Sequence, residues 1–461
     1  MDYNEKTIAA IATPIGIGGI GIIKISGRNA KNIAQKIFRP KRPIESFDSF
    51  RLCLGHIIDP KSNLPVDEVL LSIMHAPFSY TREDVVEINS HSGYTILSRI
   101  LQIILQAGAR LAKPGEFTLR AFLNGRIDLT QAEAIIDLIN AKGDMSVQLA
   151  ASQLAGGLGT RIKETRQVIV EILARINASI DFPDEEFTAI TRSHIADHIN
   201  KKILKPIKEF IAAYAQRKIW HEGIAVVIVG RVNVGKSSIL NRLLQEERAI
   251  VTPIPGTTRD ILECTVNIEG LLLRLIDTAG IRKVRGKVEQ KGVDLTKTQL
   301  GLADLTLFVV DRSRPLNQHD LELLSEIDKK TTIGVINKTD LPARLKEKKI
   351  NSTFKYLPKV NISALTGEGF KELNKAIFTR VMDKKIDTSP APIIPNLRHK
   401  MALTKAAESL EDASRNLIDG FPLETIAADL SWAKDAVDEI TGDKSNEEIL
   451  NEIFSRFCIG K

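Results

Sequence analysis

In the centre of the chain stands the sequence Gly230-Arg231-Val232-Asn233-Val234-Gly235-Lys236-Ser237, which fits the phosphate-loop pattern GxxxxGK[ST]. It follows an apolar run and opens a helical pattern over residues 238–244. In such a loop the backbone N–H groups surround a β-phosphate, the lysine contacts phosphate oxygens and the serine binds Mg²⁺. By itself the motif predicts only that the chain binds a nucleotide.

Three later motifs specify which nucleotide. They follow the phosphate loop in the order that a GTPase requires: Asp277-Thr278-Ala279-Gly280, Asn337-Lys338-Thr339-Asp340 and Ser363-Ala364-Leu365. The Asp340 carboxylate can accept from both N–H groups on the guanine edge, whereas adenine has an acceptor where guanine has its ring N–H. Together the four motifs predict a site for GTP.

Residues in and between these motifs indicate which groups contact the γ-phosphate and Mg²⁺. Thr258, in Gly256-Thr257-Thr258-Arg259-Asp260, is expected to face Mg²⁺ and the γ-phosphate. Asp277 is expected to hold Mg²⁺ through water, and Gly280 to donate its N–H. Ile281 stands where Ras-like enzymes carry the glutamine that orients water. Glu289 is the first carboxylate after Ile281. The residues alone allow two interpretations: Glu289 is a solvated surface acid, or it is the polar group that positions the attacking water.

Periodicity divides the rest of the chain into an α+β region followed by helical and α/β regions. Short apolar runs such as Gly21–Gly27 and Asp67–Met74 read as strands, and 94–107 has helical spacing. Between about 223 and 380, strand-like runs alternate with helices, which is typical of a mostly parallel sheet. Helical patterns flank this region. We predict an N-terminal α+β domain (1–119), a helical domain in two parts (120–220 and 381–461) and an inserted GTPase domain (221–380).

Several smaller signals mark the ends of these predicted elements. Asp181-Phe182-Pro183 interrupts one helical stretch, and Ser445 with Glu448 is expected to form a capping box before the last helix. Gly16–Gly21 satisfies GxGxxG, but its glycines precede a strand-like run instead of opening a helix. We therefore interpret them as tight turns or close backbone packing, not as a dinucleotide site.

Composition places the chain in a broad class. At 461 residues it has room for about three domains, and 43% hydrophobic with 26% charged residues is typical of a globular protein. No run approaches the roughly 20 apolar residues that cross a bilayer, and the first residues lack a signal-peptide pattern. We therefore expect a cytoplasmic protein that does not associate with a membrane. The scattered residues Cys53, Cys264 and Cys458 favour a reducing compartment.

The charge is a weaker guide to function. A net charge of +7 and a pI near 9.1 are compatible with an anionic partner such as RNA. A solvated surface explains the lysine and arginine excess equally well, because no basic stripe studded with aromatic residues is visible. Both interpretations stay open at this point.

The chain resembles, over nearly its whole length, the bacterial tRNA modification GTPase family. The stretches that carry the resemblance, besides the GTPase motifs, are Ala12-Thr13-Pro14, Gly18-Gly19-Ile20, Ile25-Ser26-Gly27, Glu83-Asp84-Val85-Val86-Glu87, Pro114-Gly115-Glu116-Phe117, Arg120-Ala121-Phe122-Leu123-Asn124, Gln131-Ala132-Glu133-Ala134, Asp181-Phe182-Pro183 and the terminal Phe457-Cys458-Ile459-Gly460-Lys461. The terminal Cys-Ile-Gly-Lys and the N-terminal stretches are the most specific of these.

The resemblance implies an activity and its partners. Such a protein is a homodimer that, with a flavin-dependent partner protein in a heterotetramer, adds a carboxymethylaminomethyl or aminomethyl group to the wobble uridine of certain tRNAs. GTP hydrolysis follows dimerisation of the GTPase domains across a bound K⁺. The implied K⁺ ligands are Asn233, Thr252, Ile254 and Thr257, and the implied catalytic residue is Glu289. The same comparison adds Ser238, Pro253 and Pro255 to the GTP-binding residues.

The resemblance also implies a site for formyl-tetrahydrofolate, a one-carbon donor, in the N-terminal domain. Its contacts map to Lys24, Glu87, Arg126 and Lys461. Lys24 stands where arginine is frequent, and His91-Ser92-Gly93 departs from the usual His-Gly-Gly, which bears on the strength of folate binding. Cys458 is either an ordinary thiol near the end of a helix or a group at the modification site.

A second function is compatible with the GTPase motifs. A ribosome-assembly switch would use the same motifs, with flanking domains that bind ribosomal RNA. The N-terminal stretches and the terminal Cys-Ile-Gly-Lys favour tRNA modification, because an assembly factor needs neither. A third interpretation treats the flanking helices as a scaffold only.

Overall fold

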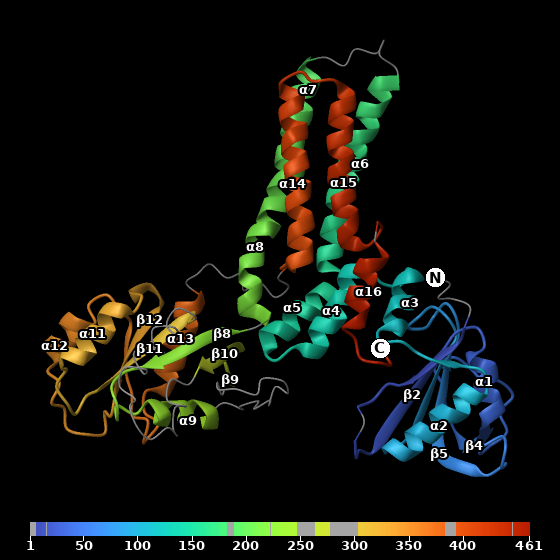
Figure 1. The fold of residues 1–461 in the computed structure, drawn as a ribbon, viewed down its shortest axis with the longest axis horizontal. Coiled ribbons are helices and arrows are strands. Elements are labelled where there is room, and N and C mark those ends of the chain that lie inside the picture. The colour runs from blue at the N-terminus through green and yellow to red at the C-terminus, as the bar shows by residue number, and fades with distance from the viewer. Residues whose placement is uncertain are drawn as a thin grey trace. The chain divides into compact units, whose positions relative to one another are not determined.

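The computed structural model describes residues 6–14, 16–181, 189–221, 223–246, 263–276, 303–382, 393–444 and 446–461. The chain forms two compact units. The first combines Met1–Ile139, Gln153–Lys208 and Arg398–Lys461, and the second combines Asn140–Ser152 and Glu209–Leu397. The multidomain α/β plus α class predicted from the sequence is confirmed (Figure 1). The boundaries at residues 119, 220 and 380 stay predictions.

The first unit begins with a seven-stranded sheet in the order β3-β4-β5-β6-β2-β1-β7. Its strands are β1 Ile8–Ile11, β2 Ile20–Ser26, β3 Phe38–Pro40, β4 Leu52–Ile58, β5 Pro65–Met74, β6 Val85–His91 and β7 Arg110–Leu111. Helices α1 (Ala30–Ile37) and α2 (Tyr94–Gln106) cover one face, where alternate strand residues such as Ile23 and Ile25 are fully buried. Leu97 of α2 packs closely over Gly21, since a Cβ there would lie 2.7 Å from Leu97 Cδ2.

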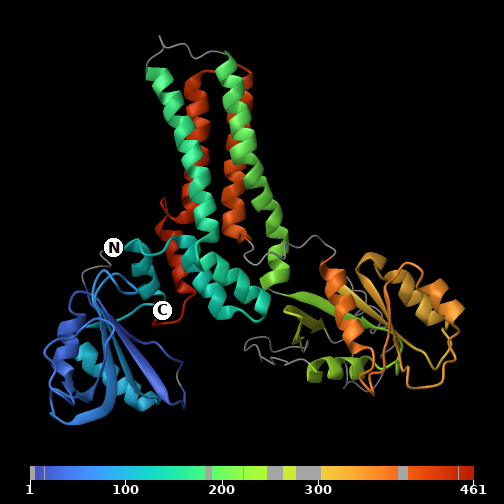
Figure 2. The same cartoon turned by 180° about the vertical axis from the view of Figure 1, so that it is seen from behind.

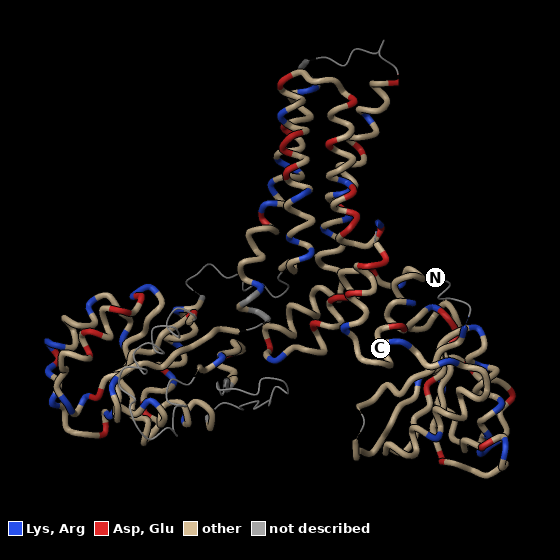
Figure 3. Tube along the Cα trace, viewed as in Figure 1, with Lys and Arg blue, Asp and Glu red and all other residues tan. Residues whose placement is uncertain are grey.

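A long helical bundle forms the rest of the first unit. Helices α6, α7, α14 and α15 run alongside one another in both views (Figures 1 and 2), with a π-helical segment, Ile199–Leu204, directly after α7. The helices of this unit are α3 Glu116–Leu123, α4 Leu129–Asn140, α6 Gly157–Asp181, α7 Ala189–His198, α14 Leu397–Ile418, α15 Leu423–Thr441 and α16 Glu447–Ser455. Ile169, Ile172 and Ile176 recur at helical spacing and form the buried face of α6, since each is at most 6% exposed. Basic and acidic residues are interspersed along these helices (Figure 3).

The start of the last helix differs from the prediction. Helix α16 begins at Glu447, and its N-cap is Asn446, whose side-chain oxygen accepts from the backbone N–H of Glu448. The capping box predicted from Ser445 is therefore wrong in its capping residue, and Ser445 itself lies outside the described residues. Asparagine is as good an N-cap as serine, and the chain uses the residue one position later.

The second unit contains a six-stranded sheet in the order β13-β12-β11-β8-β10-β9. Its strands are β8 Ile224–Val229, β9 Glu263–Ile268, β10 Leu271–Ile276, β11 Leu305–Asp311, β12 Thr332–Asn337 and β13 Lys359–Asn361. All neighbours pair in parallel except β9, which is antiparallel to β10. The helices are α5 Asp144–Leu154, α8 Lys205–His221, α9 Lys236–Glu246, α11 Gln318–Glu326, α12 Glu347–Thr353 and α13 Phe370–Met382, with a 3₁₀ turn at Lys329–Thr331.

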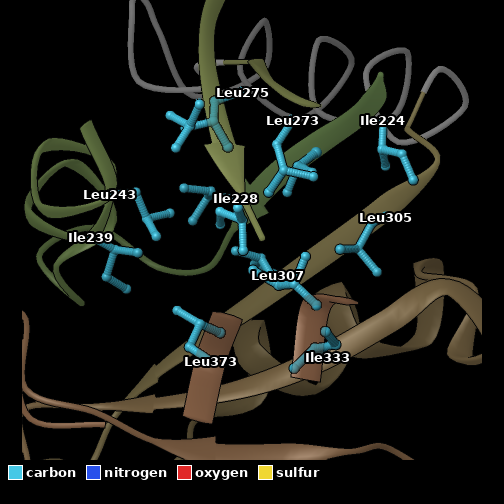
Figure 4. Packing of buried hydrophobic residues seen from close by; sticks show 14 of the residues in the cluster. Ile224, Ile228, Ile239, Leu243, Leu273, Leu275, Leu305, Leu307, Ile333 and Leu373 are labelled. Atoms are coloured by element: carbon cyan, nitrogen blue, oxygen red, sulfur yellow. The ribbon is translucent and has the colours of Figure 1, made fainter. Parts of the chain in front are cut away.

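Two clusters of buried residues, formed by alternate residues of the central strands, make up the core of this unit, and one of them packs against α9 and α13. Ile228 and Leu307 of the central strands meet Ile239 and Leu243 of α9 there, and Leu373 of α13 joins them (Figure 4). Strand β8 is buried at every residue, which explains its uninterrupted apolar sequence. The two neighbours of β8 in the sheet are β10 on one side and β11 on the other. The strand order therefore reverses at β8, which gives the sheet a switch point at the carboxyl end of this strand.

Candidate nucleotide site and folate site

The phosphate loop begins directly after β8 and depends on two glycines. Gly230 has φ 151°, and a Cβ there would lie 2.4 Å from the Val309 carbonyl oxygen. Gly235 has φ 99°, and a Cβ there would lie 2.2 Å from Nδ2 of Asn337. Both conformations favour glycine, and in both places neighbouring backbone or side chain fills the space that a side chain would need. The two glycines of the motif are thus required by geometry.

The loop leads into α9 in the way a phosphate site needs. Val234 is buried in the core and holds the loop against the sheet, while helix α9 starts at Lys236. Lys236 Nζ donates to the carbonyls of Gly230 and Arg231, each at 2.7 Å, so its ammonium group lies within the curve of the loop. Ser237 and Ser238 follow in the first turn, where the helix N-terminus favours anions.

Asn337 joins the phosphate loop to the later motifs. It ends β12, is 1% exposed, and donates from Nδ2 to the Val234 carbonyl at 2.8 Å. Its Oδ1 accepts from the Ala364 backbone N–H at 3.0 Å. One buried amide therefore ties together two of the predicted GTP-binding segments, which lie more than a hundred residues apart in the sequence.

Asp340, the residue predicted to recognise guanine, lies beside the Ser363 loop. Its side chain is exposed, and one carboxylate oxygen accepts from Ser363 Oγ at 2.6 Å. The backbone N–H of Thr339 donates to the Ile362 carbonyl at 3.2 Å, which holds the two loops together. The neighbouring Leu365 is 79% exposed. A carboxylate held by one neighbour can still accept from the two N–H groups of a guanine edge.

Lys338 connects the same two parts of the site through a contact that sequence reasoning missed. Its Nζ donates to the Asn233 carbonyl at 2.8 Å and to Asp311 Oδ2 at 2.7 Å. Asp311 is the last residue of β11 and is 1% exposed. An acid at the carboxyl end of a buried apolar strand is the only sequence signal for this role, because Asp311 belongs to none of the four motifs.

Three of the four predicted folate residues, Lys24, Glu87 and Arg126, lie near Tyr80 in the first unit. Lys24 Nζ lies 3.5 Å from a carboxylate oxygen of Glu87, its partner across strands β2 and β6. The same ammonium group lies 5.8 Å from the Tyr80 ring centroid, and the Arg126 guanidinium lies 4.6 Å from it. Burial raises the pKa of the Tyr80 hydroxyl, a change that the hydrogen bond with Thr118 and the charge of Arg126 oppose without cancelling.

The C-terminal segment brings Lys461 to strand β1 of the same unit. The Phe117 backbone N–H donates to the Lys461 carbonyl at 3.2 Å. A Cβ on Gly460 would lie 2.5 Å from the Ile11 carbonyl oxygen, so the terminal residues pass closely over the end of β1. Because β1 pairs with β2, this places the terminus near the strand that carries Lys24. Cys458 is exposed beside it.

His91-Ser92-Gly93, the stretch that departs from the family's usual pattern, has contacts of its own. His91 Nδ1 lies 2.7 Å from Asp67 Oδ1, and Ser92 Oγ donates to the Gly16 carbonyl at 3.1 Å. Gly93 has φ 151°, so glycine is needed at the third position. Ser92 at the second position therefore holds the glycine-rich turn before β2.

Two family models match the chain. One, described as the MnmE helical domain, matches residues 129–458, and the other, described as GTP-binding protein TrmE N-terminus, matches residues 7–126. The chain belongs to the tRNA modification GTPase MnmE family. It is accordingly a GTP hydrolase, as the sequence predicts.

Individual members of the MnmE family match from end to end. The tRNA modification GTPase MnmE of Carboxydothermus hydrogenoformans is 45% identical over 99% of this chain and 100% of that protein. The protein of the same name from Geobacter metallireducens is 46% identical over 100% of both chains, and that from Lactiplantibacillus plantarum is 43% identical over 99% and 98%. The chain thus spans the full length of these MnmE proteins.

Part of the site predicted for this MnmE-family chain lies outside the described residues. The residues concerned are Thr252, Pro253, Ile254, Pro255, Gly256, Thr257, Thr258, Asp277, Thr278, Ala279, Gly280 and Glu289. Their roles toward Mg²⁺, K⁺, the γ-phosphate and water stay predictions. Within the part of the chain that is described, no helix is long and apolar enough to span a bilayer.

Proposed function

We propose that the chain is a K⁺-dependent GTPase that acts with a flavoprotein partner on tRNA, adding a carboxymethylaminomethyl or aminomethyl group to the wobble uridine. The observation that carries this proposal is the end-to-end relation to tRNA modification GTPases, in a chain whose described nucleotide motifs converge on one edge of a sheet. We further propose that it works as a homodimer in the cytoplasm, inside a heterotetramer with that partner.

In this proposal, residues of the phosphate loop and of the two guanine-recognition loops bind GTP. Lys236 and the N-terminus of α9 attract the phosphates, and Ser237 in the first turn supplies a hydroxyl to Mg²⁺ together with Thr258. Asp340 reads the guanine edge, held by Ser363. Mg²⁺, when bound, would neutralise charge on the β- and γ-phosphates.

Asn233 supports the K⁺ part of the proposal. It is exposed in the phosphate loop with φ 65°, and Lys338 fixes its backbone carbonyl. The exposed Asn233 side chain extends from this fixed backbone, and its amide oxygen is of the kind that suits a monovalent cation, with Thr252, Ile254 and Thr257 as the proposed remaining ligands. K⁺, when bound, would add a fixed positive charge near the phosphates, in place of an arginine finger.

Glu289 is our candidate for positioning the attacking water. Ile281 cannot perform that task, because its side chain has no polar group. We expect Glu289→Ala to lower the turnover of GTP by about a hundredfold or more while the affinity for GDP stays within about twofold. Turnover is measured by phosphate release and affinity with a fluorescent GDP. An unchanged turnover would remove Glu289 from the mechanism.

The cluster around Tyr80 supports binding of a reduced folate. Lys24, Arg126 and Lys461 are cations, and Glu87 is a carboxylate on the same sheet face as Lys24. Cations suit the carboxylates of a folate tail, and a carboxylate suits the amide-like edge of a pterin. Titration calorimetry with formyl-tetrahydrofolate tests this site, with Lys24→Ala as the variant expected to lose binding. Absence of heat with the unaltered protein would refute the site.

The experiment that tests the proposed function compares GTP hydrolysis in K⁺ and in Na⁺ at equal ionic strength. We expect strong stimulation by K⁺, and little stimulation in an Asn233→Ala variant. The tRNA arm is tested separately by deleting the gene and measuring the wobble uridine. If the modified wobble uridine persists after deletion, tRNA modification is excluded and the result favours the ribosome-assembly alternative.

A further inference from the structure

Asp311 lies outside every GTPase motif, yet it faces one of them directly. It ends β11 and pairs in register with Asn337, the last residue of β12. The next residue along the chain from Asn337 is Lys338, so the two carboxyl strand ends bring the Asp311 carboxylate beside the Lys338 ammonium group. Their distance of 2.7 Å describes an ion pair in which the anion is buried, with Asp311 1% exposed, and the Lys338 side chain is 27% exposed.

The Asp311 carboxylate is held on both oxygens. Oδ1 accepts from the backbone N–H of Ser313 at 2.9 Å and from Ser313 Oγ at 2.7 Å, and Oδ2 accepts from Lys338. The exposed Arg314 Nε lies farther from Oδ2, at 3.7 Å. Burial raises the pKa of the Asp311 carboxyl, but the hydrogen bonds from Lys338 and Ser313 outweigh it and leave the pKa below its ordinary value. The group is thus a fixed anion in a fixed orientation.

Lys338 in turn controls the backbone of the phosphate loop. Its second acceptor is the Asn233 carbonyl, at 2.8 Å. Asn233 and Lys338 have φ values of 65° and 68°, a left-handed region that lysine rarely adopts. Such conformations persist only where surrounding contacts hold them. Asp311 is the anion that holds Lys338 in this conformation.

We infer that Asp311 is a positioning residue of the GTPase site, which acts through Lys338 to fix the Asn233 carbonyl and so couples the guanine-recognition loop to the phosphate loop. Loss of its charge should loosen both loops at once. The affinity for guanine nucleotides would fall. The affinity for a cation at the Asn233 amide would fall as well, because the backbone that carries this side chain would no longer be fixed. The cation part of this inference rests on the proposed K⁺ dependence.

A double-mutant cycle on nucleotide affinity tests the inference. The four proteins are the unaltered chain, Asp311→Asn, Lys338→Met and the double variant, each titrated with N-methylanthraniloyl-GDP in the full-length form. We expect Asp311→Asn to weaken binding by about tenfold, since it removes one partner of a charged hydrogen bond. The double variant should bind no more weakly than Lys338→Met alone. Additive losses would show that Asp311 does not act through Lys338 and would overturn the inference.

Two matched controls separate positioning from general loss of stability. Ser313→Ala removes a hydrogen bond to the same carboxylate but leaves the Lys338 pair, and it should change affinity by no more than about twofold. Asp438→Asn removes a buried anion paired with Arg166 and Lys434 in the other compact unit, and it should leave affinity unchanged. If Ser313→Ala weakens binding as much as Asp311→Asn, the contact with Lys338 is not the cause and the inference fails.

The K⁺ concentration that gives the half-maximal rate of hydrolysis distinguishes positioning from a structural role, because a substitution that only destabilises the fold would leave this concentration unchanged. In Asp311→Asn we expect the K⁺ concentration for half-maximal rate to rise by about tenfold, with kcat at saturating K⁺ within about threefold. Lys338→Met provides the same test if Asp311→Asn does not fold, and an unchanged half-maximal concentration in Lys338→Met would overturn the cation part. If the unaltered protein shows no K⁺ stimulation, the proposed function fails on that point, and the GDP cycle still decides the role of Asp311.

Discussion

Gly235 carries the sharpest prediction at the scale of single residues. A methyl group there would meet the Asn337 amide at 2.2 Å, in a backbone conformation that already disfavours alanine. Asn337 cannot move away without losing its bonds to Val234 and Ala364. We expect Gly235→Ala to weaken GDP binding by about a hundredfold, measured by fluorescence titration. Gly108→Ala is the control, because φ is also positive there but nothing lies within 4 Å of the added Cβ.

Asp340 makes a prediction about nucleotide choice. In Asp340→Asn the side-chain amide would turn a donor toward a guanine N–H, whereas xanthine offers a carbonyl at that position. We expect the affinity for GTP to fall by about a hundredfold and the affinity for XTP to rise. Competition of both nucleotides against one fluorescent probe gives the ratio directly. An unchanged ratio would mean that Asp340 does not contact the base.

The residue scale also shows where sequence reasoning stops. Asn337 and Asp340 could be predicted, because their motif has one spacing and one chemistry. Asp311 could not, because its function depends on the register that sets it opposite Asn337 in the neighbouring strand. Tyr80 likewise has no local signal, since Lys24 and Arg126 reach its ring from distant parts of the chain. Contacts that depend on strand order are invisible to a motif.

At the scale of elements, burial decides what could be predicted. Strand β8 coincides with an uninterrupted apolar run, because both faces of the sheet are covered there, and β10 is apolar apart from Arg274. Strand β9 was missed, because its sequence Glu263–Ile268 mixes polar and apolar residues at the edge of the sheet. An antiparallel edge strand tolerates that mixture.

The terminal segment after α16 is an element whose placement can be tested. Gly460 has φ 95°, and its missing side chain lets the chain pass the Ile11 carbonyl. Gly460→Ala should displace Lys461 and weaken formyl-tetrahydrofolate binding by about tenfold, with GTP hydrolysis unchanged. Gly420→Ala tests the backbone strain alone, since φ there is 78° and nothing lies within 4 Å of the added Cβ. Equal effects of both substitutions on folate binding would contradict the predicted displacement.

At the scale of the whole molecule, the first unit is assembled from segments on both sides of the second in the sequence. Glu133 of α4 joins them. Its carboxylate accepts from Arg398 Nε at 2.9 Å and from Arg398 Nη2 at 2.8 Å, and His399 Nε2 lies 2.6 Å from it. Arg398 also donates to the Glu439 and Ile440 carbonyls at the end of α15. Through Arg398, the Glu133 carboxylate therefore links α4 to α14 and α15, which follow the GTPase region in the sequence.

Because the Glu133 carboxylate is charged, we predict that the free energy of unfolding of the first unit falls at acidic pH. Burial raises the pKa of the Glu133 carboxyl, but His399 and Arg398 outweigh it and hold the pKa well below its ordinary value. A depressed carboxyl pKa stabilises the fold at pH values above the unfolded value of about 4.3, and the contribution is lost as pH falls from there toward the folded pKa. We expect Glu133→Gln to lower the free energy of unfolding at pH 7 by about 3 kcal/mol, because it removes the largely buried anion that pairs with Arg398.

The difference between the two proteins should shrink as the pH is lowered from 5 to about 3, since the unaltered chain then loses the same contribution. Urea unfolding followed by Trp432 fluorescence, in a Trp220→Phe background, reports on the first unit because Trp432 lies in α15. GTP hydrolysis at pH 7 without urea serves as the control for the second unit. A stability difference that stays constant across this pH range would mean that Glu133 stabilises the helices through packing and not through its charge.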